Sequence, residues 1–164
     1  VKATSEVFKT MMQMKVVPGD IVVEKAKPRN AQVIGSIGVA GFLSGSISVF
    51  LDRALAASSA AKMLMLDDPL AISDEELVDA VGELVNMIGG NIKTALFKKT
   101  PLFDISVPSV YIGQDLRRRT ISDDLCFLVP FTYEKATFQV EFLMITKKDG
   151  EGTGVQASLL AGKT

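Results

Sequence analysis

One long amphipathic stretch, from Asp74 to about Lys98, constrains the fold of this chain more than any other feature. Ser73 and Glu76 open it as a capping box, in which a hydroxyl and a carboxylate three residues later satisfy two backbone N–H groups. Apolar residues then recur at helical spacing and form a stripe along one face. The stripe consists of Leu77, Val81, Leu84, Ile88, Ile92 and Ala95, with Val78, Val85 and Leu96 on its flank. A stripe of this length has to be buried, so we expect the helix to lie on a sheet.

The rest of the chain indicates an α+β fold, in which helices pack on one face of an antiparallel sheet. The helical stretches precede or separate groups of strands and do not alternate with single strands. We expect further helices over 4–14 and 53–66, and strands over 21–23, 32–39, 42–51, 105–112, 125–133 and 137–146. Ala40-Gly41 is the expected hairpin turn, and Lys27 to Asn30 is expected to break the chain between strands. Glycines inside the second and third strands indicate that another element packs closely on them.

The length favours a single domain. A chain of 164 residues is long enough to bury a core, and its 48% hydrophobic residues are typical of globular proteins. We expect residues 1–147 to form one domain and residues 148–164 to form a flexible C-terminal tail.

Charge and hydropathy exclude several classes of partner. A formal net charge of −1 does not favour nucleic-acid binding. The run Arg117-Arg118-Arg119 is the one local exception, and it favours a solvated turn over a phosphate site. No stretch approaches the roughly 18 apolar residues of a membrane span, so we expect a cytoplasmic protein without a membrane partner.

The reactive residue types are scarce. The chain has no histidine, which excludes Ser-His-Asp and Cys-His catalysis as well as zinc sites that use histidine. Its single cysteine, Cys126, lies in an apolar run and is interpreted as a small buried side chain and not as a nucleophile.

The face of the long helix opposite the stripe carries the candidate site. Glu83 and Asn86 are three positions apart and therefore project to one place, with Gly90 just beyond them and Asp79 beside them. Two glycines inside a helix, Gly89-Gly90, cost about 1 kcal/mol each relative to alanine. Either a partner surface that approaches closely or helix–helix packing would account for that cost. Solvent exposure alone would also place polar residues on this face.

The chemistry open to this pair is limited. An exposed glutamate has a pKa near 4.3 and is a weak base at neutral pH. An asparagine amide does not titrate, but it can hold a water molecule through its oxygen and nitrogen. The pair could therefore only assist hydrolysis of a bond that is activated elsewhere.

The segment from Glu83 to Lys93, ELVNMIGGNIK, resembles the signature helix of the CheC/CheX/FliY phosphatases of bacterial chemotaxis. CheC-type relatives carry a second E-x-x-N on the other, pseudo-symmetric helix. The nearest candidate here, Glu6 to Lys9, ends in lysine where that motif has asparagine. The chain is therefore most similar to CheX, which has a single motif.

This resemblance implies hydrolysis of the aspartyl phosphate of a CheY-like receiver domain. Asn86 would align the attacking water, and Glu83 would pair with a lysine of the receiver, on a docking surface that includes Gly90 and Asp79. The receiver would supply Mg²⁺, and this chain would bind no cofactor of its own. A homodimer is also implied. The alternative is a non-enzymatic module that binds a receiver domain or a motility component.

Overall fold

The computed structural model describes residues 1–96, 103–119 and 124–145. The expected tail over 148–164 lies outside these residues, so its structure is not described. The elements, in chain order, are α1 (Lys2–Met12), β1 (Val17–Pro18), β2 (Val22–Lys25), β3 (Arg29–Gly41), β4 (Gly45–Leu51), α2 (Arg53–Met63), the 3₁₀ turn η1 (Pro69–Ala71), α3 (Asp74–Leu96), β5 (Phe103–Ile105), β6 (Ser109–Arg118), β7 (Leu125–Tyr133) and β8 (Ala136–Met144).

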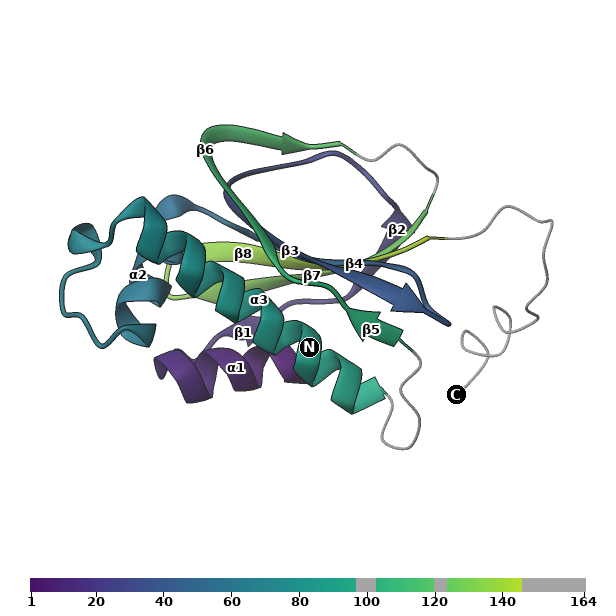
Figure 1. Ribbon diagram of the computed structural model, residues 1–164, viewed down its shortest axis with the longest axis horizontal. Helices are drawn as coiled ribbons and strands as arrows, with labels where there is room; N and C mark the ends of the chain where they lie inside the picture. The colour runs from purple at the N-terminus through teal and green to yellow at the C-terminus, as the bar shows by residue number, and fades with distance from the viewer. Residues whose placement is uncertain (97–102, 120–123, 146–164) are drawn as a thin grey trace.

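The strands form one antiparallel sheet in the order β1-β7-β8-β4-β3-β5. In addition, β2 pairs with β7, and β6 pairs with β3. The three α-helices gather on one side of the sheet, and the ribbon made by β3 and β6 arches away from them (Figure 1). The expected α+β fold with an antiparallel sheet and helices on one face is confirmed.

The apolar stripe of α3 is buried against the sheet, as predicted. Leu77, Val81, Leu84 and Ile88 are each at most 1% exposed. On β3, a Cβ added to Gly35 would lie 2.9 Å from Cγ1 of Val81, so this glycine allows the helix to approach the strand closely. The prediction that an element packs on the strand glycines is confirmed at this position.

One residue of the predicted flank, Val78, and one member of the predicted stripe, Ala95, are exposed. Val78 is 38% exposed because it lies at the outer edge of the apolar arc, about 100° around the helix from Leu77. Ala95 is exposed because it lies in the last turn of α3, beyond Ile88, the last fully buried residue of the stripe. A single helix buries an arc of limited width and length, which the sequence pattern overestimated.

Several predicted boundaries are wrong. The helix α1 ends at Met12, where Gln13 takes a left-handed conformation with φ of 54°, and α2 ends at Met63. Strand β3 already begins at Arg29, where a break was expected, and it continues through Ala40 to Gly41. The hairpin turn is therefore displaced to residues 42–44. The strand expected over 105–112 is two strands, of which β6 continues to Arg118.

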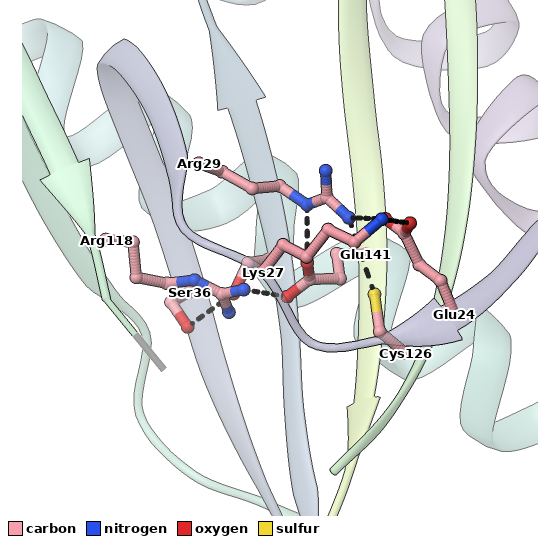
Figure 2. Close-up of polar contacts among 8 residues, drawn as sticks. Glu24, Lys27, Arg29, Ser36, Arg118, Cys126 and Glu141 are labelled. Atoms are coloured by element: carbon pink, nitrogen blue, oxygen red, sulfur yellow. Dashed lines mark hydrogen bonds and ion pairs between the residues drawn. The ribbon is translucent and has the colours of Figure 1, made fainter. Parts of the chain in front are cut away.

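A cluster of buried charges ties the β3–β6 ribbon to β8. The carboxylate of Glu141 on β8 is fully buried, and it accepts a hydrogen bond at 2.7 Å from Nε of Arg29 and another from Arg118 (Figure 2). Arg29 also donates to Glu24 at 2.8 Å. Burial by itself lowers the pKa of Arg29. Its hydrogen bonds to Glu141 and Glu24 raise the pKa by more than that, so the net shift is upward. Arg29 therefore stays charged within the cluster.

The interpretation of Cys126 as a buried side chain is confirmed. Its thiol is fully buried beside Arg29, which donates to Sγ at 3.7 Å. Burial raises the pKa of the Cys126 thiol to about 11, so the reactive thiolate is scarce at neutral pH. In the described part of the chain, no helix is both long and apolar enough to cross a membrane.

Candidate functional site

The start of α3 is set by the predicted capping box. The backbone N–H of Ser73 donates to the carboxylate of Glu76 at 2.9 Å, and the N–H of Glu76 donates to Oγ of Ser73 at 3.2 Å. The hydrogen bonds from the Ser73 backbone and side chain lower the pKa of Glu76. This reciprocal pair fixes the first turn, and with it the phase of every later residue on the helix.

The pair Glu83 and Asn86 faces away from the sheet. Leu84 and Val85, which lie between them in sequence, are 1% and 0% exposed, and their burial fixes the rotation of the helix about its axis. Glu83 is therefore exposed and Asn86 half-buried on the outer face. Neither side chain forms a hydrogen bond or an ion pair with another residue of the described ranges. Both are available to a partner.

The two adjacent glycines have different surroundings. A Cβ added to Gly89 would lie 3.3 Å from Cγ2 of Ile37, so this glycine allows α3 to pack on the sheet. A Cβ added to Gly90 would have no atom within 4 Å. Internal packing therefore explains Gly89 but leaves Gly90 unexplained. Gly90 lies on the same face as Glu83 and Asn86, and Asp79 is exposed one turn before Glu83.

Lys93 continues the same face beyond Gly90. Its Nζ forms an ion pair at 2.8 Å with Asp104 of β5, whose side chain is 89% exposed. An ion pair this exposed contributes little to stability. The structure thus brings all four predicted residues, Asp79, Glu83, Asn86 and Gly90, onto one solvent-facing surface of α3, which we call the α3 surface.

A family profile described as "Chemotaxis phosphatase CheX" matches residues 33–132, a segment that includes all of α3. The chain belongs to the CheX family of chemotaxis phosphatases. No protein with a curated description matches it.

Solved structures agree with this family membership. The CheX protein of Desulfovibrio desulfuricans has a TM-score of 0.78 and 30% identity, over 88% of this chain and 95% of that chain. A CheX–CheY–BeF3–Mg²⁺ complex from Borrelia burgdorferi has a TM-score of 0.71 and 26% identity, over 88% of this chain and 94% of that chain. FliY of Thermotoga maritima shares the fold, with a TM-score of 0.59 and 19% identity over 84% of this chain and 81% of that chain.

The sequence reasoning missed the Arg29–Glu141–Arg118 cluster. Arg29 and Glu141 are 112 positions apart, and Arg118 and Glu141 are 23 apart. No local spacing marks such a set, because only the sheet topology brings these strands together.

Proposed function

We propose that this protein hydrolyses the aspartyl phosphate of a CheY-like response regulator. The observation that carries the proposal is the α3 surface of a CheX-family chain, where Asn86 and Glu83 face outward without a side-chain partner among the residues that the structure describes. The Borrelia CheX relative that was solved with CheY supports the class of partner.

In the proposed reaction, Asn86 orients a water molecule for attack on phosphorus. A new P–O bond forms to the water oxygen, and the bond between phosphorus and the aspartate oxygen breaks. The aspartate leaves as a carboxylate, and inorganic phosphate is released. The amide can accept a hydrogen bond from the water through its oxygen and donate through its nitrogen, without a change in its own charge. Correct positioning, and not proton transfer, is the contribution of Asn86.

Glu83 is assigned to docking. It is exposed, and its carboxylate can pair with a lysine of the receiver, while Asp79 adds a second negative charge one turn away. Within the described ranges, no group of three or more Asp, Glu, His or Cys residues could hold a metal ion. The donor set of the described residues does not fit Mg²⁺, so we propose that the receiver supplies the ion.

The test is the decay of a phosphorylated CheY-like receiver in the presence of Mg²⁺, with and without the full-length protein. We expect catalytic acceleration at a ratio of protein to receiver well below one. If several receivers of the same organism bind the protein but lose phosphate at their intrinsic rates, the chain is a docking module and the proposal is wrong.

Gly90 should show a conflict between stability and activity. Gly90→Ala should stabilise the protein by about 0.5–1 kcal/mol, because alanine favours a helix and its Cβ meets no neighbour. The same methyl group should slow receiver dephosphorylation, because it fills the space beside Asn86. Chemical unfolding and the phosphatase assay on the same variant measure the two effects.

Two glycines of the same helix serve as matched controls for Gly90. A Cβ on Gly82 would be 3.7 Å from Pro108 and 3.8 Å from Val110, so Gly82→Ala should be stabilising with unchanged activity. Gly89→Ala should be destabilising, because its Cβ would crowd Ile37. If the Gly90→Ala variant dephosphorylates the receiver at the wild-type rate, the assignment of Gly90 to the docking surface is wrong.

We also propose that the protein acts in the cytoplasm as a homodimer. The edge strands β1 and β2 expose Val17, Val22 and Val23 to 60%, 43% and 51%. A sheet edge with exposed apolar residues is a template for pairing with another chain. Sedimentation equilibrium should give twice the monomer mass, and Val23→Lys should shift the protein to the monomer. A monomeric wild-type protein would refute the dimer.

A further inference from the structure

The arginine run Arg117-Arg118-Arg119 has no part in the proposed phosphatase site, and the structure separates its members. Arg118 is turned onto Glu141 and stacks at 5.1 Å over the ring of Phe50. Arg119 is exposed just after the end of β6. Arg117 is also exposed, but it lies within the strand. The sequence-based interpretation of the run as a solvated turn is therefore wrong for its first two residues.

Two cavities border the β3–β6 ribbon, and Arg117 lines both of them. The first, of about 380 Å³, is lined by Pro28, Arg29, Asn30, Arg117 and Gln139. The second, of about 420 Å³, includes Ser36, Ser46, Ser109, Tyr111 and Arg118 in its lining. Neither lining contains an aspartate or a glutamate. The first cavity is therefore rich in hydrogen-bond donors, and both cavities lack negative charge in their linings.

The positive charges around the first cavity are not equally compensated. Arg29 is neutralised by the buried Glu141 and by Glu24, whose side chain is 19% exposed. The side chain of Arg117, in contrast, forms no hydrogen bond or ion pair with any residue that the structure describes. A protein with an overall charge of −1 thus carries one uncompensated guanidinium at a donor-rich cavity.

The neighbours of Arg117 have the chemistry to complete an anion site. Asn30 lies directly opposite Arg117 in the antiparallel register of β3 and β6, so the two side chains leave the ribbon on the same face. The guanidinium presents parallel N–H donors that match the oxygens of a phosphate or carboxylate group. The amide of Asn30 supplies a further N–H donor on the same face, and Gln139 also belongs to the lining.

We propose that the first cavity binds a small soluble oxyanion, a molecule that carries a phosphate or carboxylate group. Arg117 provides the charge, and Asn30 provides an additional donor. The site is built on β3, β6 and β8 and contains no residue of α3, so it is separate from the proposed phosphatase site. Whether this site binds an anion is independent of whether the protein is a phosphatase.

Isothermal titration of the full chain with inorganic phosphate, and separately with citrate, tests the proposal at constant ionic strength. We expect saturable binding of at least one of the two anions to one site per chain. Arg117→Gln should weaken it at least about tenfold, the loss of one charge-assisted hydrogen-bonding partner. Asn30→Ala should also weaken it, without any change in net charge. Receiver dephosphorylation should be unchanged in both variants.

Arg119→Gln is the matched control, since it removes the same charge from a position that lines neither cavity. It should bind as the wild type does. Absence of saturable binding by the wild type, or equal losses in Arg117→Gln and Arg119→Gln, would overturn the proposal. Thermal unfolding in chloride checks the fold of each variant. If the Arg117→Gln variant is unfolded, anion binding by the Asn30→Ala variant is the test, and wild-type affinity in that variant would overturn the proposal.

Discussion

Replacing Asn86 by alanine should slow dephosphorylation of a CheY-like receiver about 100-fold, while the affinity for the receiver stays close to that of the wild type. A factor of 100 corresponds to roughly 2.7 kcal/mol of barrier, a reasonable value for the orientation of one water molecule. Affinity should change little, because docking is assigned to Glu83 and its surroundings. The measurements are single-turnover decay of the phosphorylated receiver and direct binding of the same receiver.

Asn91→Ala is the matched control for Asn86→Ala. Asn91 is an exposed asparagine of the same helix, but it lies about 140° around the axis from Asn86. It should retain wild-type activity. Glu83→Ala should weaken binding whether the protein is an enzyme or a docking module, so it does not separate the two. An Asn86→Ala variant as active as the wild type would refute the role of Asn86, even if the phosphatase function itself stands.

The second large effect is expected far from the α3 surface, in the buried charge cluster. Glu141→Gln keeps the shape of the side chain but leaves the guanidinium groups of Arg29 and Arg118 without their shared carboxylate. Breaking a buried ion pair from one side typically costs about 3–5 kcal/mol. For a chain of this size, that loss lowers the midpoint of thermal unfolding by roughly 6–20 °C. Calorimetry or circular dichroism on the variant measures it.

An exposed ion pair provides the comparison for Glu141. Asp104→Asn breaks the pair between Lys93 and Asp104, in which the aspartate is 89% exposed. Its effect should stay within about 0.5 kcal/mol, as for most surface substitutions. If Glu141→Gln and Asp104→Asn lowered the free energy of unfolding by similar amounts, the burial of Glu141 would not determine its contribution to stability.

The parts of this protein that could be predicted from sequence are those controlled by helical periodicity. The capping box of Ser73 and Glu76, the apolar stripe, and the outward face with Glu83 and Asn86 all depend on residues three or four positions apart. Such spacing has nearly the same geometric consequence in any α-helix. The predicted arc nevertheless included Val78 and Ala95, because periodicity does not show how wide or how long the contact with the sheet is.

The strands were predicted less accurately, because their limits depend on pairing partners. The residues from Arg29 onward resemble a break in sequence, but pairing of β3 with β6 extends the strand through them. The same pairing places Arg117 and Arg118 in a strand, where one lines two cavities and the other contacts Glu141. Strand pairing supplies the backbone hydrogen bonds that local propensity does not reveal.

The sequence alone determined that α3 forms, which of its faces is buried, and that Glu83, Asn86 and Gly90 share the other face. These are local consequences of a helix with 3.6 residues per turn. Only the tertiary structure distinguished Gly89, which packs on Ile37, from Gly90, which contacts nothing, and only it joined Arg29, Arg118 and Glu141. These relations depend on contacts between segments far apart in the chain, and such contacts exist only once the sheet has been assembled.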